Sequence, residues 1–396
     1  MEKKYIIAGK FIDGTGSEAK ENVGILIEDD KIKRIDDAAK IPEDCKVYDF
    51  SNKTIMPGLI NAHVHLAYEI PGLNENEITD VDVAISSIKE LKEYLESGVT
   101  HIRVCGASTY LDVKLRDAMR KGLIKGPSII AAGRGITMTG GSGHRTEIEA
   151  DGVDECRKAA RFVIKQGADF IKIVSTGSIG TKGILPGSPQ LSCEELKAAI
   201  DEAHKAGKKV GSHAHGSEGI KNAVLAGIDS IEHGSYLTDE IIDLMKERGT
   251  YLVPTLTVMY LSEIERQKGG VSEEVLKKSK GIKEANSDSF RRAYKAGIKI
   301  VTGTDVGTKN NTPDKSWYEL KLMVENGVTP MEAIMAATKN ASELLGISDC
   351  YGTLEEGKMC DLIVMSENPL ENIEAVSKID TVFKHGEEIN FGSYIV

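Results

Sequence analysis

The sequence predicts an α/β protein: a (β/α)8 barrel of the TIM type, with a small β-sandwich domain formed by both ends of the chain. Between about residues 54 and 307, helical segments end in glycine and lead directly into short β-branched strands, giving eight strands. Residues 1–53 and 350–396 instead show alternating strands and turns. Eight strands separated mostly by helices favour a closed barrel, although a doubly wound open sheet is the alternative for such a pattern.

The barrel elements repeat one unit of helix, tight turn and strand. The first strand lies in "TIMPGLINAHVHL" and the third in "GPSIIAAGRGI". The other six follow a helix in "YLESGVTHIRV", "VIKQGADFIKIV", "AHKAGKKVGSH", "AVLAGIDSIEH", "MKERGTYLVP" and "AYKAGIKIVTG". We expect the glycines of these units to be left-handed, just past a helix C-terminus, where a side chain would be strained. They are Gly98, Gly167, Gly207, Gly227, Gly249 and Gly297.

The two ends of the chain differ from the middle. Segments such as "YIIAGKFIDGTG" and "GTLEEGKMCDLIVMS" alternate short strands with Gly and Asp turns. The first of these segments precedes the helical pattern and the second follows it. The last helical stretch runs from about Thr329 to Leu345. We therefore expect one β-sandwich domain from residues 1–53 and 350–396, packed against a barrel of residues 54–349.

Composition excludes several classes of partner. The 396 residues carry 50 basic and 61 acidic side chains, a net charge of −11, without a dense Lys/Arg stripe. Binding to nucleic acid or to an anionic membrane is therefore not expected. The N-terminal segment "MEKKYIIAGKFIDGTG" reaches a glycine after three apolar residues, too few for a signal-peptide core, and no apolar run approaches the length of a membrane span. A cytoplasmic location is therefore expected. Six scattered cysteines without CxxC spacing are expected to be reduced thiols outside any metal site.

Several strands end in metal-binding side chains. In "NAHVHL", His63 and His65 project from the same face of a strand because successive side chains alternate. "KKVGSHAHG" carries His213 and His215, "DSIEHGS" carries His233 and "KIVTGTDVG" carries Asp305. All lie at the C-terminal ends of predicted strands, where barrel active sites form. We expect them to converge on metal ions, while His215 could equally be a core histidine.

Lys172 completes the set. In "ADFIKIVSTG" it lies on the strand face opposite Ile171 and Ile173, which directs it into the barrel. Burial beside a divalent cation disfavours a charged ammonium. The neutral amine can react with carbon dioxide to give a carbamate whose two oxygens bridge two metals. The alternative is a lysine that reaches the rim of the barrel with its charge in water.

This order of residues resembles the binuclear subtype of the amidohydrolase superfamily. "GADFIKIVSTG", "EELKAAIDEAHKAGKKVGSHAHG", "AGIDSIEHGSYL" and "VPTL" are similar to its prolidase-like branch, metal-dependent dipeptidases that release a C-terminal residue such as proline or arginine. The resemblance covers nearly the whole chain. It implies that one metal is held by His63, His65 and Asp305, the other by His213 and His233, and that carboxylated Lys172 bridges them.

The resemblance implies hydrolysis of a peptide or other amide by a metal-bridging hydroxide. Zinc is the first choice for imidazole and carboxylate ligands, which manganese, cobalt and iron also accept. Asp305 would take the proton of the bridging water and pass it to the departing amine. The rival functions are a mononuclear deaminase or imidazolone-ring hydrolase of the same superfamily, which would not need Lys172, and a non-catalytic scaffold, which would be expected to lack ligands.

The expected substrate is a small molecule with a free carboxylate, a dipeptide or an N-acyl amino acid. His144 in "GGSGHR" and Tyr236, three residues after His233, are predicted to donate hydrogen bonds to that carboxylate. The alternative is an exposed loop histidine and a tyrosine packed on the helix that starts near Thr238. A compact barrel with helical outer faces commonly pairs with itself, so a homo-oligomer is the default expectation.

Overall fold

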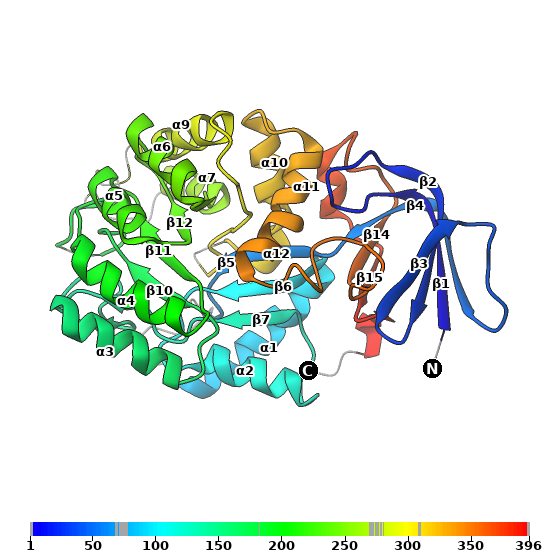
Figure 1. Cartoon of the computed structure of the whole chain (residues 1–396), viewed down its shortest axis with the longest axis horizontal. Helices are drawn as coiled ribbons and strands as arrows, with labels where there is room; N and C mark the ends of the chain where they lie inside the picture. The colour runs from blue at the N-terminus through cyan, green and yellow to red at the C-terminus, as the bar shows by residue number, and fades with distance from the viewer. Residues whose placement is uncertain are drawn as a thin grey trace.

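A computed structural model of the chain describes residues 3–67, 70, 78–181, 183–268, 273, 277, 279, 281–307 and 310–393. Residues 1, 2 and 394–396 of the predicted terminal domain thus lie outside the described part. Figure 1 shows a barrel surrounded by helices, and a sheet built from both ends of the chain beside it. The predicted α/β architecture is confirmed.

The barrel wall consists of two parallel sheets. One has the order β5-β6-β7, and the other has the order β13-β12-β11-β10-β8-β9. The Asp169 N–H donates to the Ala131 carbonyl at 2.7 Å, which links the segment before β10 to β7. The strands are β5 (Leu59–Val64), β6 (Val99–Val104), β7 (Ser128–Ala131), β8 (Ile136–Thr137), β9 (Ile148–Glu149), β10 (Ile171–Val174), β11 (Val210–Ala214), β12 (Ser230–His233) and β13 (Tyr251–Val253).

The predicted eighth strand closes the barrel without forming a regular ladder. Its backbone bonds first to β13, where the Val301 N–H donates to the Leu252 carbonyl at 3.0 Å. It then crosses to β5, where the Ala62 N–H donates to the Thr302 carbonyl at 2.9 Å. The segment pairs with each of these two strands over too few residues to form a regular strand itself. Isolated bridges join Leu252 to Ile300 and Val64 to Val306.

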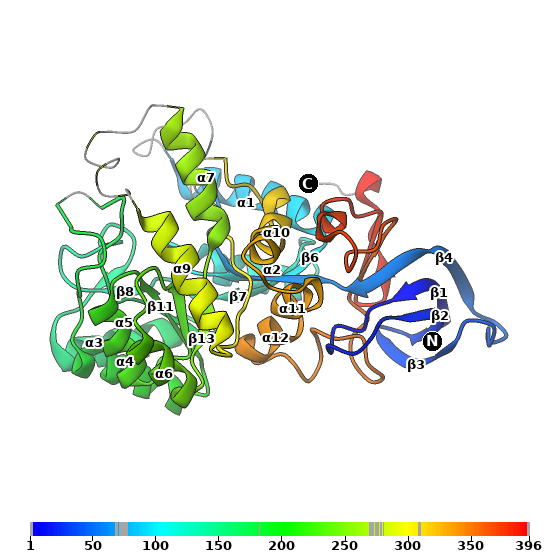
Figure 2. The same ribbon diagram turned by 90° about the horizontal axis from the view of Figure 1, so that it is seen from above.

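Helices cover the outside of the barrel, and Figure 2 shows α7 and α9 rising over one end. All six predicted turn glycines have positive φ, between 68° and 97°, which confirms their left-handed conformation. The helices are α1 (Asp80–Glu96), α2 (Leu111–Arg120), α3 (Gly152–Lys165), α4 (Cys193–Lys205), α5 (Ser217–Ala226), α6 (Asp239–Arg248), α7 (Leu256–Gln267), α9 (Ile282–Lys295), α10 (Trp317–Glu325), α11 (Pro330–Ala336) and α12 (Lys339–Leu345). Short 3-10 turns are η1 (Pro313–Lys315), η2 (Ile373–Ser377) and η3 (Phe391–Ser393).

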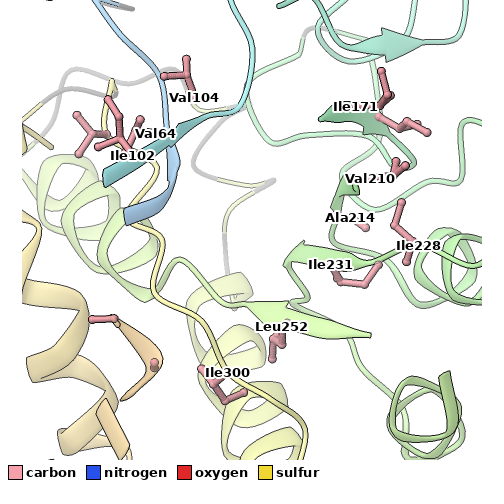
Figure 3. Close-up of a cluster of buried hydrophobic side chains, with 14 of the residues drawn as sticks. Val64, Ile102, Val104, Ile171, Val210, Ala214, Ile228, Ile231, Leu252 and Ile300 are labelled. Atoms are coloured by element: carbon pink, nitrogen blue, oxygen red, sulfur yellow. The ribbon is translucent and has the colours of Figure 1, made fainter. Parts of the chain in front are cut away.

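The main hydrophobic core lies between the strands and the helices. Figure 3 shows apolar side chains from β5, β6, β10, β11, β12 and β13 within this cluster, including Val64, Ile171 and Ile231. Each is fully buried. Because side chains alternate along a strand, the residues beside them face the inside of the barrel. Packing of the outer face therefore fixes which side chains point inward.

The terminal strands form one mixed sheet of seven strands in the order β16-β15-β14-β4-β1-β2-β3. Ile6, Ile25 and Phe383 belong to its separate core. β4 continues to residue 57, past the predicted domain boundary at residue 53, and the exact boundaries stay a prediction. None of the helices in the described part of the chain could span a lipid bilayer, because none is both long and apolar enough. The strands are β1 (Lys3–Phe11), β2 (Lys20–Glu28), β3 (Lys31–Asp37), β4 (Lys46–Pro57), β14 (Leu362–Met365), β15 (Thr381–Lys384) and β16 (Glu387–Glu388).

Candidate metal centre

The end of β5 and the closing segment bring His63, His65 and Asp305 together. The Asp305 N–H donates to the His63 carbonyl at 2.8 Å, and the His65 N–H donates to the Val306 carbonyl at 2.8 Å. This pairing places Oδ1 of Asp305 3.3 Å from Nε2 of His63 and 3.4 Å from Nε2 of His65. Three of the predicted ligands thus share one end of the barrel.

A second group of imidazoles lies at the ends of β11 and β12. His233 pairs with Ala214 in the parallel ladder, so its ring lies 4.6 Å from the rings of both His213 and His215. The ring of His233 is also 5.2 Å from that of His63. Among the described residues, three sets of side chains have ligand atoms within 4.8 Å of one another, and two of them contain His233: His213, His215 and His233; and His63, His233 and Asp305.

Hydrogen bonds to Nδ1 orient three of these imidazoles. Nδ1 of His63 lies 2.8 Å from Oε2 of Glu232. Nδ1 of His215 lies 2.8 Å from the Ser235 hydroxyl, and that of His233 lies 2.7 Å from the Thr255 hydroxyl. A histidine that binds a metal through one nitrogen typically donates its other N–H in this way.

The protonation of the second group suits metal binding. Burial lowers the pKa of His215 to about 4, and it also lowers the pKa values of His213 and His233 well below the usual range. These imidazoles are therefore neutral near pH 7, with a lone pair to donate. Burial also opposes a charge on His63, but Cys105 and Asp305 raise the pKa of His63 above its usual value.

Lys172 lies on β10 with 4% of its surface exposed. Within the described part of the chain, neither its Nζ nor Nε2 of His213 has a hydrogen-bond partner. Buried polar atoms are nearly always paired, so two unpaired nitrogen atoms at one site indicate an additional group there. Together with imidazole and carboxylate donors, they fit a site for divalent cations.

In the described part of the chain, the side chains of the two predicted substrate contacts, His144 and Tyr236, form no hydrogen bond with the side chains of this cluster. His144 is exposed in a turn, and its Nδ1 lies 2.9 Å from the Gly141 carbonyl. Tyr236 is 41% exposed, while its backbone N–H donates to the His215 carbonyl at 2.9 Å. Tyr236 therefore follows the cluster closely along the chain, and the role of both residues stays a prediction.

Four residues around the cluster were not predicted from the sequence. Arg103 and Glu232 lie inside the barrel and form an ion pair of 2.7 Å, and charged letters within the apolar strands "THIRV" and "SIEH" were the available signal. Cys105 has its sulfur near His63 and Glu232 in a third potential ligand group, which corrects the expectation that every cysteine lies outside the site. No disulfide joins any of the six cysteines, in agreement with the predicted reduced thiols.

The fourth missed residue, Glu147, occupies a space left by three glycines. A Cβ on Gly106, Gly135 or Gly143 would come within 3.0 Å of the Glu147 side chain. Burial raises the pKa of this carboxyl, although the Gly135 N–H, His65 and Lys172 lower it. The sequence shows these glycines and Glu147, but it does not show that the glycines surround the Glu147 carboxylate.

Two of the predicted ligands have strained backbones. His233 and Asp305 have φ of 71° and 55°, a region that residues other than glycine seldom occupy. Asn286 donates its side-chain amide to the His233 carbonyl at 2.7 Å, and Asn311 does the same to the Asp305 carbonyl at 2.9 Å. Such strain concentrates at functional sites, where the surroundings hold it in place.

Comparison with known proteins agrees with this geometry. The sequence model of the amidohydrolase family matches residues 54–389. An ochratoxinase of Aspergillus niger is 31% identical over 422 residues, which cover 96% of this chain and 85% of that protein. The structure of a Xaa-Pro dipeptidase with methionine bound in its active site superimposes with a TM-score of 0.91 at 35% identity, covering 98% of this chain and 100% of the other. A prolidase complexed with N-methylphosphonate-L-proline gives a TM-score of 0.91 at 26% identity, with coverages of 98% and 99%.

Proposed function

The chain belongs to the amidohydrolase family, and from this membership we propose that it is a binuclear metallo-dipeptidase of the prolidase type. Its coarser activity, metal-dependent hydrolysis of a C–N bond, follows from the family and from the histidine clusters. The finer proposal is that it cleaves a dipeptide or an N-acyl amino acid with a free C-terminal carboxylate. The observation that carries it is the set of imidazoles around Asp305 and the unpaired Lys172, in a chain similar to a Xaa-Pro dipeptidase.

We assign the proposed ligands by their position in the barrel. His63, His65 and Asp305 would hold one divalent cation, and His213 and His233 would hold the other. Carboxylated Lys172 would lie between the two cations, which explains why its Nζ has no hydrogen-bond partner in the described part of the chain. Zinc is the proposed metal, because neutral imidazoles and carboxylates are typical zinc ligands.

When bound, the cations lower the pKa of water and polarise a carbonyl oxygen. The protein must then move one proton from the attacking water to the departing amine. Asp305 can accept this proton because its carboxyl group is ionised. Burial raises its pKa, but His63 and the other histidines outweigh that effect and hold the pKa well below the usual range. The ionised carboxylate accepts the proton, and the nearby leaving nitrogen receives it.

The proposed activity can be tested with a substrate panel. Metal-stripped protein is reconstituted with Zn²⁺, Mn²⁺ or Co²⁺ and given Xaa-Pro and other dipeptides, N-acyl amino acids, an imidazolone and aminated purines. We expect free C-terminal amino acids from a dipeptide or an N-acyl amino acid, with two metals per chain. The metal-stripped protein is the matched control. Release of ammonia or opening of the imidazolone, without amide hydrolysis, would overturn the proposal.

Recognition of the carboxylate by His144 and Tyr236 has its own test. A hydrogen bond to a charged group contributes roughly 1.5 to 3 kcal/mol, or about ten- to a hundredfold in kcat/KM. His144→Asn and Tyr236→Phe should lose about that factor on a dipeptide and little on the matching dipeptide amide. Equal losses on both substrates would show that these residues have another role.

A further inference from the structure

A buried charged network lies directly behind the proposed metal ligand His63. Oε2 of Glu232, on β12, is 2.8 Å from Nδ1 of His63 on β5, and its Oε1 accepts a 2.7 Å bond from Nη2 of Arg103 on β6. The exposed fractions of Arg103, Glu232 and His63 are 2%, 0% and 1%. Three strands thus contribute to one chain of contacts inside the barrel.

Contacts on every side fix the Arg103 guanidinium. Its Nε donates to the Ala62 carbonyl at 2.5 Å, and its Nη1 donates to the Ser230 hydroxyl at 3.2 Å. The guanidinium also lies over the Phe170 ring, 5.0 Å from the ring centre. Because Ala62 immediately precedes His63, Arg103 holds both the backbone and, through Glu232, the imidazole of this proposed ligand.

A fourth strand, β11, leaves room for this network of Arg103, Glu232 and His63. Gly211 on β11 carries no side chain, and a Cβ there would lie 2.8 Å from Oε1 of Glu232 and 3.3 Å from Nη1 of Arg103. Burial of an ion pair is costly, and apolar residues of similar volume are often as stable or more stable. Stability alone therefore gives little reason to place charges here, whereas orientation of His63 does.

We propose that Glu232 and Arg103 are positioning residues of the metal centre: Glu232 fixes the direction of the His63 ring, and Arg103 fixes Glu232. This inference rests on the proposed binuclear function. Glu232 accepts the Nδ1 proton of His63, which leaves Nε2, on the side of Asp305, as the ligand atom. Neither residue contacts the reacting atoms, so both act through His63.

The test compares Glu232→Gln, Arg103→Met and the double variant with wild type. Glutamine keeps the shape of glutamate but loses its charge, and methionine replaces arginine without a polar group. The matched control is Asp361→Asn, which breaks the buried Lys384–Asp361 ion pair of the terminal sheet. Affinity for Zn²⁺ is measured by competition with a chromophoric chelator, ligand geometry by the visible absorption of Co²⁺-loaded protein, and stability by thermal unfolding of metal-free protein.

We expect Glu232→Gln to lower the affinity for one of the two Zn²⁺ ions by about 10- to 100-fold. The visible absorption spectrum of the Co²⁺-loaded protein should also change. The double variant should recover thermal stability, because no unpaired charge remains, without recovering Zn²⁺ affinity. Asp361→Asn should lose stability and keep both Zn²⁺ affinities.

Two results would overturn this inference alone. The first is wild-type affinity for both Zn²⁺ ions in Glu232→Gln. The second is full recovery of affinity in the double variant, which would show that only charge balance matters. A wild-type protein that binds no Zn²⁺, Mn²⁺ or Co²⁺ would instead refute the proposed function, and the positioning role with it.

Discussion

Replacement of Lys172 by methionine should have opposite effects on stability with and without metal. The Lys172 side chain is 4% exposed, and its Nζ has no hydrogen-bond partner in the described part of the chain. A buried donor without a partner costs about 1–3 kcal/mol, and methionine fills a similar space without that donor. The metal-free Lys172→Met protein should therefore be more stable than metal-free wild type by about 1–3 kcal/mol.

Zinc should reverse this order. A ligand at 1,000 times its dissociation constant stabilises the folded state by about 4 kcal/mol, and wild type should gain this stabilisation from each tightly bound ion. Lys172→Met lacks the proposed bridging carbamate, so it should gain less. Wild type with Zn²⁺ should then be the more stable protein and the only one with full activity.

Urea unfolding measures both effects. Far-UV circular dichroism follows the helices, and the fluorescence of Trp317, the only tryptophan, follows α10. Each protein is unfolded in excess chelator and in excess Zn²⁺, with the exposed Lys114→Met as the matched control. A metal-free Lys172→Met protein that is less stable than metal-free wild type, or an equal gain in stability from Zn²⁺ in both proteins, would contradict this prediction.

Three other predictions follow from single residues. Asp305→Asn should fold and lower kcat by about 10²- to 10⁴-fold at equal metal content, and an unchanged kcat would remove the proton-transfer role. Burial lowers the pKa of His215 from 6.5 to about 4, so between these pH values the unfolded state binds a proton that the folded state does not. The free energy of unfolding is therefore highest above pH 6.5 and decreases as the pH falls to 4. Between pH 6.5 and 4, metal-free His215→Gln should lose about 3 kcal/mol less free energy of unfolding than metal-free wild type, as measured by urea unfolding. The same pH dependence in both proteins would contradict this. Gly211→Ala, with its Cβ 2.8 Å from Oε1 of Glu232, should lower stability by about 1–3 kcal/mol in thermal unfolding, whereas Gly180→Ala, with nothing within 4 Å, should not.

Local sequence patterns were enough to predict the residues that strand alternation and strand ends determine. His63 and His65 share a face because of the two-residue period, and the same rule turns Lys172 away from Ile171 and Ile173. The structure places Lys172 inward and both isoleucines in the outer core. The position of Asp305 followed from its place after the last strand of a closed barrel, because closure brings the first and last strands together.

Contacts between distant strands could not be predicted in this way. Arg103 and Glu232 are separated by 129 residues, and they meet only because β6 and β12 face each other across the closed barrel. A regular eighth strand was expected, but the closing segment forms hydrogen bonds first with β13 and then with β5, each over only a few residues. Loop residues such as His144 have no periodic constraint, so sequence gives their chemistry without their position.

The strained backbone at His233 solves a geometric problem that the sequence alone does not reveal. Ile231 on β12 packs in the outer core, so strand alternation turns Glu232 inward and would turn His233 outward. Both consecutive side chains nevertheless reach His63: the Glu232 carboxylate is 2.8 Å from Nδ1, and the ring of His233 is 5.2 Å from the His63 ring. The φ of 71° at His233 breaks the alternation and returns its ring to the interior. A left-handed residue with a side chain costs on the order of 1–3 kcal/mol, and the hydrogen bonds from Asn286 to the His233 carbonyl and between Thr255 and the imidazole offset that cost. One strand thereby supplies a proposed metal ligand and the carboxylate that orients another ligand, which is possible only because the backbone leaves regular geometry between them.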